Sequence, residues 1–391
     1  MRNRVTRRRL TGAAGLLLLA ARAARGAEPA VPLTLAQVVE LSGSGALSGD
    51  AWRSGVELAV QEINAAGGLL GRPLAVVTFD AQSSAAAARL AFQHALELDP
   101  LALLGPVLPE PARSALTVAR PRGTAVILGG GAADLTGPAH PATFRPVPSA
   151  AALMARLGQW LHDAAKAPRL AVLWSGRDPY RTSRDALARA AREHGLAIAA
   201  DWVTESTDTA ADVARLLSAL PDLLVVLLPD EQAGHAIVEA RRQAPQLALL
   251  GEASLLSAPA LAVAGATAEG VRAHVLLAPE PDGSPPAGFA ARYTAADRQA
   301  PDDMALAGYL AVGMVRAAAA KSGSADPRVL ADALRELAVT AAREPMLLAD
   351  CAWNAAGDPD RASWIVEQRA GKRRSVQQLH DATAAGVAAH D

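Results

Sequence analysis

Apolar positions along this chain alternate between a helical spacing and short continuous runs. In one early unit, four apolar residues share a helical face at i, i+3, i+4 and i+7: Val56, Ala59, Val60 and Ile63. Asp50 precedes them as a candidate N-cap, and the glycine pair 67–68 can adopt the positive φ with which a helix ends. Residues 74–79 then form an apolar run typical of a strand buried on both faces. The unit predicts a helix, a glycine turn and a strand.

The same alternation continues along most of the chain. Apolar runs predict strands at 35–41, 74–79, 101–104, 124–128, 170–174, 197–203, 223–228, 247–250 and 271–278. Helical spacing predicts helices at 52–65, 84–98, 109–120, 150–164, 180–194, 209–220 and 231–242, and a largely helical stretch at 288–337. Residues 346–353 and 363–368 are typical of a terminal hairpin. Strands and helices that alternate in this way favour mostly parallel, doubly wound sheets, so the predicted fold class is α/β.

Length and loop composition predict two lobes. With 391 residues, the chain is too long for one ordinary core. The proline-rich stretch 138–148 interrupts the rhythm and is a candidate crossover to a second lobe. The Pro/Gly loop 279–286 is the candidate return crossover.

Residues 1–26 are typical of a signal peptide. Residues 1–9 contain five arginines and no acid, and residues 12–21 form an apolar run too short to span a bilayer. Small residues at 24 and 26 suit cleavage before Ala27. Residues 6–10 (T-R-R-R-L) resemble a twin-arginine signal, and an ordinary Sec signal is the alternative. Both predict a periplasmic location.

Charge excludes one class of partner. Cleavage would remove seven Arg and no Asp or Glu, so the net charge would change from −1 to about −8. An acidic surface opposes nucleic-acid binding. Outside the signal, no apolar stretch is long enough to predict stable membrane insertion. The single cysteine, Cys351, lies on a predicted strand and is expected to be a small buried apolar residue.

Motifs for catalysis or cofactor binding are absent from the sequence. No G-x-x-x-x-G-K-[ST], G-x-S-x-G or H-E-x-x-H occurs. The glycines at 129–131 follow a strand but lack the spacing of a dinucleotide site, and the eight histidines include no close pair. We therefore expect no enzyme activity, no cofactor and no metal.

Several motifs carry a resemblance to a known family. They are E-I-N-A-A-G-G-L-L-G-R at 62–72, L-L-G-P-V at 103–107, the run that begins A-R-Y-T-A-A-D at 291–312, and W-N-A-A-G-D at 353–358. With these motifs, residues 33–372 resemble the type I periplasmic solute-binding proteins of ABC importers, in particular the leucine/isoleucine/valine-binding family.

The resemblance implies two discontinuous lobes joined by three hinge crossovers, near 145–149, 278–281 and 343–344. Lobe 1 would comprise 33–146 and 280–342, lobe 2 would comprise 147–279 and 343–370, and 371–391 would be a C-terminal tail. It also implies a monomer that works with the permease and ATPase subunits of an ABC transporter.

We expect the ligand site beyond the carboxyl ends of the strands, where open α/β sheets bind ligands. Five loops occupy that edge: 42–50, 105–111, 129–134, 229–232 and 251–254. The candidate ligand-binding residues are Ser48, Glu110, Gly130, Gly131, Tyr180, Asp230 and Glu252. For Ser48, a role in the turn is the alternative.

In the first lobe, the candidate positions differ from those of the branched-chain binders. Where that family holds the ligand with a serine-rich segment and an Ala-Thr pair, this chain has L-P-E-P at 108–111 and G-G-A at 130–132. The prolines remove N–H donors, and a ligand carboxylate about 4 Å from Glu110 would meet about 4 kcal/mol of repulsion at an effective dielectric near 20. We expect a ligand other than a leucine-type zwitterion, unless Glu110 is a solvated first-turn helix residue that points away.

In the second lobe, the candidate positions are acidic. Tyr180 matches a family tyrosine, Asp230 falls near another, and Glu252 lies near the family glutamate that accepts a ligand ammonium. An Asp230/Glu252 pair would suit an amine or polyhydroxy ligand, and the alternative for each is an exposed acid at a helix start. Met304 takes an aromatic position of the pattern and equally suits the core.

The expected function is capture of a small polar molecule, such as an amino acid, by hinge closure, and its delivery to an ABC permease. The alternative is a ligand sensor of the same fold that signals to a partner. A third reading, a Rossmann-type enzyme, would require cofactor binding.

Overall fold

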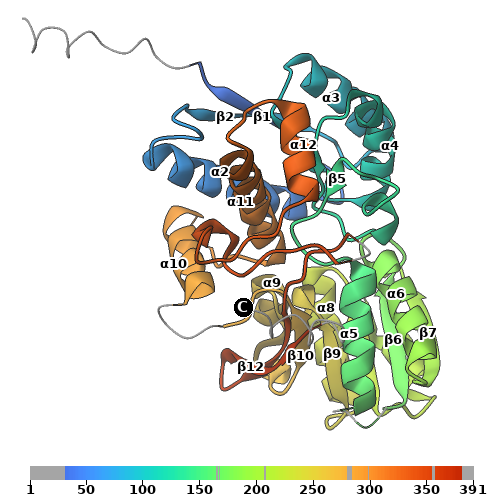
Figure 1. Ribbon diagram of the computed structural model, residues 1–391. Coiled ribbons are helices and arrows are strands. Elements are labelled where there is room, and N and C mark those ends of the chain that lie inside the picture. Colours follow the sequence, from blue (N-terminus) through green and yellow to red (C-terminus); the bar gives the residue numbers. More distant parts are fainter. Residues whose placement is uncertain are drawn as a thin grey trace, which may run out of the picture.

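The computed structural model describes residues 31–380, except 164–165, 167, 207, 280–283, 298 and 355–356. The predicted signal peptide 1–26 and residues 381–391 of the predicted tail lie outside the described residues. Two lobes, each built on its own sheet, stack end to end (Figure 1). The predicted α/β class with two mostly parallel sheets is confirmed.

The first lobe contains a five-stranded parallel sheet in the order β2-β1-β3-β4-β5. Its strands are β1 (Leu33–Val39), β2 (Leu74–Asp80), β3 (Ala102–Leu104), β4 (Val126–Ile127) and β5 (Thr143–Phe144). Its helices are α2 (Ala46–Ala65), α3 (Ala85–Glu97) and α4 (Pro109–Ala119), with α10 (Pro285–Asp297), α11 (Asp303–Ser322) and α12 (Pro327–Arg335) added by the returning chain.

The second lobe contains a seven-stranded sheet in the order β12-β11-β10-β9-β8-β6-β7. Its parallel strands are β6 (Leu170–Ser175), β7 (Ile198–Thr204), β8 (Leu223–Leu227), β9 (Ala248–Glu252) and β10 (Arg272–Val275). Two antiparallel strands complete it, β11 (Ser363–Arg369) and β12 (Lys372–Leu379). Its helices are α5 (Ala150–Asp163), α6 (Tyr180–Glu193), α7 (Ala210–Leu217), α8 (Asp230–Gln243) and α9 (Ala258–Ala264).

Helix α2 begins earlier than its apolar pattern indicates. Gly45 is the N-cap, so the predicted cap Asp50 lies inside the helix, where it pairs with Arg53 at 2.6 Å. A Cβ on Gly49 would lie 1.9 Å from the carbonyl oxygen of Glu40. The first turn therefore packs through backbone, and its one large apolar side chain, Leu47, is exposed, so the apolar pattern of the buried face does not extend into this turn.

The terminal hairpin was predicted in the wrong place. It is formed by β11 and β12 around Ala370 and Gly371, both of which have positive φ, so residues 372–379 are a strand and not part of a tail. Strand β12 lies at the sheet edge and is exposed along most of its length. An exposed edge strand lacks the apolar alternation by which strands are predicted.

Residues 343–353 were also assigned to the wrong lobe. Leu347, Leu348 and Cys351 are buried in the core of the first lobe, and Cys351 forms a β-bridge with Val339. The third crossover therefore lies after Trp353, not near 343–344. The prediction that Cys351 is a buried apolar residue is confirmed, since the free thiol is 1% exposed.

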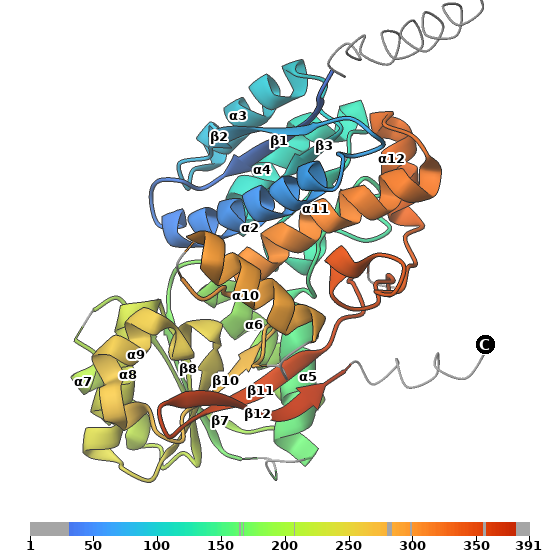
Figure 2. The ribbon, with the colours of Figure 1, turned by 90° about the vertical axis from the view of Figure 1, so that its left-hand side faces the viewer.

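Helices α2 and α11 cross at backbone contact in the first lobe (Figure 2). A Cβ on Gly55 would lie 2.0 Å from the Ala305 carbonyl oxygen, and one on Gly308 would lie 2.1 Å from that of Trp52. Among the described helices, α11 alone has the length and apolar composition to cross a membrane, and 78% of it is buried inside the protein. Its apolar surface is therefore explained by the core of this lobe.

Candidate ligand-binding site

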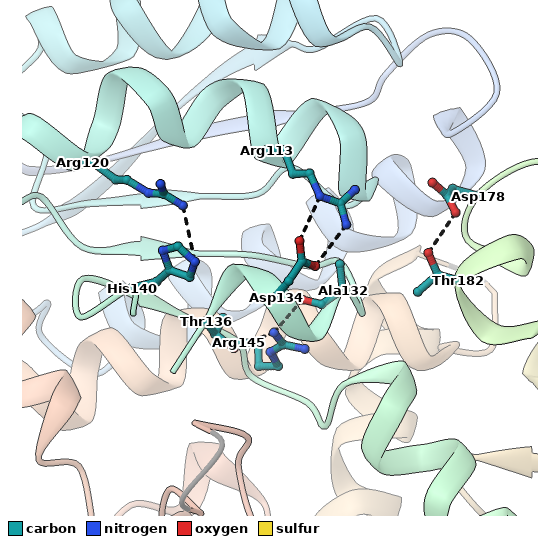
Figure 3. Close-up of polar contacts among 9 residues, drawn as sticks. All are labelled: Arg113, Arg120, Ala132, Asp134, Thr136, His140, Arg145, Asp178 and Thr182. Atoms are coloured by element: carbon teal, nitrogen blue, oxygen red, sulfur yellow. Dashed lines mark hydrogen bonds and ion pairs between the residues drawn. The ribbon is translucent and has the colours of Figure 1, made fainter. Parts of the chain in front are cut away.

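Helix α4 of the first lobe and the loop after β6 of the second lobe lie near each other (Figure 3). Arg113 of α4 forms an ion pair with Asp134 at 3.0 Å. Hydrogen bonds to Asp134 raise the pKa of Arg113, and the charge of Asp178 in the second lobe adds to the effect. Figure 3 shows Asp178 and Thr182 on the opposite side of the gap from Arg113. Charged groups of the two lobes thus lie within electrostatic reach of each other.

The loop after β1 is tied to the loop after β2. Asp80 accepts hydrogen bonds from the Leu41 N–H at 2.9 Å and from the Ser42 hydroxyl at 2.7 Å. The Ser83 hydroxyl accepts from the Gly45 N–H at 2.9 Å and donates to the Ser42 carbonyl at 2.7 Å. These bonds hold the loops at this edge of the first lobe together.

Glu40 is a functional candidate that the sequence analysis missed. It follows β1, is fully buried, and accepts from the N–H groups of Val107 at 2.9 Å and Leu108 at 3.2 Å. Burial raises the pKa of Glu40, these two N–H bonds oppose the rise, and the charge of Asp80 adds to it. A charged residue directly after a buried strand was the available signal.

The predicted first-lobe residues lie at this edge, with two qualifications. Ser48 is half-buried in the first turn of α2, not in a loop. Glu110 is exposed in the first turn of α4. This matches the alternative stated for it, a solvated residue in the first turn of a helix. A Cβ on Gly130 would lie 2.7 Å from the Val107 carbonyl oxygen, and the Gly131 carbonyl accepts from the Ala150 N–H at 2.9 Å. The two glycines let backbone segments pack closely, and ligand contacts for all four residues stay a prediction.

In the second lobe, the structure brings together Tyr180, Asp230 and Glu252. They stand at the start of α6, at the start of α8 and at the end of β9. The Ser183 hydroxyl donates to Glu252 at 2.6 Å. Burial raises the pKa of Tyr180, and the charges of Asp230 and Glu252 raise it further, in that order. Three candidate residues from distant parts of the sequence therefore form one group.

Two further acids, at the start of α11, were missed. Asp302 caps the helix by accepting from the Ala305 N–H at 2.8 Å. Asp303 accepts from the N–H groups of Leu276 at 3.1 Å and Leu277 at 3.0 Å, on the second crossover. The neighbouring Met304 was singled out because it takes an aromatic position of the family pattern. Asp302 and Asp303 were passed over, because acids before an apolar run are the ordinary start of a helix.

Burial shifts the protonation of these acids upward. It raises the pKa of Glu252 to about 7, opposed by the Ser183 bond and assisted by the charge of Asp303. It raises the pKa of Asp303 to about 6, opposed by the crossover N–H groups and by Arg373 and assisted by Asp302. The pKa of Asp230 is also raised, first by burial. This side of the cleft is therefore acidic and short of counter-charge.

A buried polar network connects two crossovers. Asp358 accepts from the Ser149 N–H at 2.9 Å and the Ser149 hydroxyl at 2.8 Å, and it lies 3.4 Å from the guanidinium of Arg145. Arg145 also donates to the Ala132 carbonyl at 2.7 Å and to Thr136 (Figure 3). The loop after β4 is thus connected to the predicted hinge.

The described residues also line a cavity away from the candidate group. A cavity of about 550 Å³ lies between β12, α10 and the crossovers, and its walls include Leu277, Pro285, Leu348, Trp364 and Val376. None of the candidate site residues lines it. No group of three or more His, Cys, Asp or Glu residues in the described part of the chain is arranged to hold a metal ion.

Comparison with solved structures finds solute-binding proteins of ABC transporters. One from R. palustris in complex with benzoate has a TM-score of 0.76 and 20% identity, covering 89% of this chain and 96% of that one. A leucine-binding protein from Thermotoga maritima has a TM-score of 0.75 and 16% identity, covering 89% and 99%. A branched-chain amino acid binding protein from Streptococcus pneumoniae in complex with isoleucine has a TM-score of 0.75 and 21% identity, covering 88% and 99%. At these identities the likeness shows the fold.

A search of curated protein sequences finds no match. A family model described as periplasmic binding protein matches residues 32–373. The match runs from the start of the first sheet into β12 and includes both lobes and all three crossovers. The resemblance on which the sequence analysis relied is therefore confirmed, and this chain belongs to the periplasmic binding protein family.

Proposed function

We propose that this protein is an exported solute receptor of an ABC transporter. Residues 1–26 act as the signal peptide, and the mature protein works in the periplasm after export by the Sec or twin-arginine route. A small polar molecule enters between the lobes, the crossovers bend, and the closed receptor delivers its ligand to the permease. Membership of the family and the two-lobed arrangement, with α4 near the loop after β6, support this proposal.

The observation that carries the ligand side of the proposal is the grouping of Tyr180, Asp230 and Glu252. Glu252 has a raised pKa and accepts one hydrogen bond, from a hydroxyl, so a cationic partner would strongly stabilise its charged form. The ligand we propose therefore carries an amine, as amino acids and their derivatives do. Benzoate and isoleucine, bound by two of the similar structures, are solutes of the size that we propose for this receptor.

Ligand binding is tested with the mature protein, unfolded and refolded to remove any bound solute. Thermal unfolding is followed with amino acids, amino acid amides, polyamines, polyols and small acids. A ligand at about 100 times its Kd stabilises the folded state by about 2.7 kcal/mol. We expect amines to give the largest shifts, and Glu252→Gln to reduce them. Glu193→Gln, an exposed acid at the end of α6, is the matched control and should change nothing.

Delivery is tested separately, with the permease and ATPase that the host produces with this protein. Liposomes that contain the transporter should hydrolyse ATP faster when the ligand-loaded receptor is added. A receptor that binds its ligand but does not stimulate the transporter would contradict the transport role. Stimulation of a histidine kinase instead would support the sensor.

A further inference from the structure

The amino end of α4 has almost no free backbone donor. Pro109 and Pro111 have no N–H group, and the N–H groups of Val107 and Leu108 both donate to Glu40. Within 107–111, only the Glu110 N–H remains for a ligand. A helix amino end is otherwise a natural place for a carboxylate. Here the protein supplies that carboxylate itself.

Packing holds Glu40 in this position. The side chain is 0% exposed. A Cβ on Gly45 would lie 3.1 Å from the Glu40 Cβ and 2.9 Å from a methyl carbon of Leu108, so these groups surround it closely. Glu40 cannot leave the donors without separating α2 from the turn before α4. A ligand carboxylate would therefore have to bind beside an existing one.

We propose that Glu40 is a specificity-determining residue that makes the first-lobe side of the cleft reject carboxylates. The carboxylate of Glu40 satisfies the donors at the start of α4 and presents its own negative charge behind them. The preferred solutes are then amines, amides or hydroxyl compounds without a free carboxylate on this side. This inference rests on the proposed receptor function and narrows its ligand class.

The size of the effect follows from simple electrostatics. A ligand carboxylate about 4 Å from Glu40, at an effective dielectric near 20, would bind roughly a thousandfold more weakly than a neutral group of the same shape. Exposed Glu110 adds repulsion of the same sign. Nearby Asp80 also carries negative charge. Every acid named at this edge thus acts in the same direction.

The test uses pairs of solutes that differ only in the carboxylate. Suitable pairs are leucine with leucinamide, isoleucine with isoleucinamide, and arginine with agmatine. Titration calorimetry on the refolded wild-type protein should show the member without the carboxylate binding at least a hundredfold more tightly in the pair that fits best. If the amino acid binds as tightly as its partner, the role of Glu40 is refuted while the receptor function stands. If no member of any pair binds, the proposed amine-binding function itself is contradicted.

Variants locate the effect in Glu40. Glu40→Ala and Glu40→Gln should each raise the affinity for the amino acid relative to its amide by at least tenfold, with the larger change in Glu40→Ala. Glu97→Gln, an exposed acid at the far end of the same lobe, should leave that ratio unchanged. Circular dichroism checks that each variant is folded. If Glu40→Ala does not fold, the test uses Glu40→Gln and the solute pairs on the wild-type protein. An unchanged ratio of amino acid affinity to amide affinity in a folded Glu40 variant would refute the inference.

Discussion

Glu252 gives the proposed cleft a group that titrates near neutral pH. Its pKa is raised to about 7 by burial, and Asp303 nearby titrates at about 6. The Ser183 hydroxyl and the phenol of Tyr180 also face it. If a ligand amine binds the charged form of Glu252, its affinity must depend on pH in the range where Glu252 loses its proton.

The expected size follows from the pKa. With a pKa of about 7, Glu252 is about 90% charged at pH 8 and about 1% charged at pH 5. The affinity for a cationic ligand should therefore fall about a hundredfold between those values, or about 2.7 kcal/mol. Protonation of Asp303 would weaken binding further below about pH 6, in the same direction.

The ligand-free protein should show the opposite trend. An acid whose pKa is raised on folding stabilises the folded state most below its unfolded pKa, and this contribution is lost as the pH rises through the folded pKa. For Glu252, the window runs from an ordinary value of 4.5 to about 7, and the loss is about 3 kcal/mol. Glu252→Gln removes the titration, so the ligand-free variant should be more stable than the wild type at pH 8 and similar to it at pH 4.5.

Two measurements check this prediction. Titration calorimetry with a bound amine, between pH 5 and pH 8, should give a steep affinity profile for the wild type and for Glu193→Gln. For Glu252→Gln the profile should be much shallower, with only the small decrease below about pH 6 that protonation of Asp303 causes. Urea unfolding of the ligand-free proteins gives the stability difference. An affinity independent of pH in the wild type, or the same slope in Glu252→Gln, would refute the assignment of Glu252 as the carboxylate that receives the amine.

Two predictions concern the framework that holds the cleft. Gly308→Ala places a Cβ 2.1 Å from a backbone carbonyl of α2, so it should lower the free energy of unfolding by about 3 kcal/mol or more. In Gly313→Ala on the same helix, the new Cβ has its nearest atom at 3.4 Å, so the loss should be under about 1 kcal/mol. Urea unfolding measures both values. Asp358→Ala leaves buried Arg145 without its counter-charge and should lower the free energy of unfolding by about 3–5 kcal/mol. Ser149→Ala removes the hydroxyl bond to Asp358 and the bond that the hydroxyl accepts from the Ala152 N–H, and should lower it by about 1–2 kcal/mol. If the two glycine variants lost equal free energies of unfolding, the packing of α2 on α11 would be contradicted. Equal losses for the Asp358 and Ser149 variants would contradict the buried network.

Most of the fold could be predicted because its signals are local. The helix at 85–97 and the strand at 74–80 each carry their own periodicity, so their bounds were predicted to within about one residue. β12 (Lys372–Leu379) could not be predicted in this way, because it is an exposed edge strand and has no buried face that would make apolar and polar residues alternate. Residues 343–353 were misplaced because the lobe in which Leu347 and Cys351 are buried depends on contacts with residues far away in the sequence.

The grouping of candidate residues was predictable where the resemblance supplied the partners and not elsewhere, and their contact with a ligand stays a prediction. Tyr180, Asp230 and Glu252 were proposed together by the resemblance, and they do lie together. Glu40 binds donors 67 and 68 residues away, and Asp358 binds Ser149 209 residues away. Nothing in the neighbourhood of either acid in the sequence indicates these pairings, because both depend on how the chain returns to the same edge or crossover.

How each buried carboxyl is compensated indicates which of them a ligand can use. Asp303 accepts from two backbone N–H groups, so a ligand cation would add less to a charge that the fold already stabilises. Glu252 accepts one hydrogen bond, from a hydroxyl, and keeps its proton up to about pH 7. A cation beside it would therefore stabilise a carboxylate charge that the fold itself stabilises little. Although the cleft contains several acids, a ligand amine should therefore depend on Glu252 and Asp230 much more than on Asp303. Among single Asn or Gln substitutions, loss of binding should follow that order.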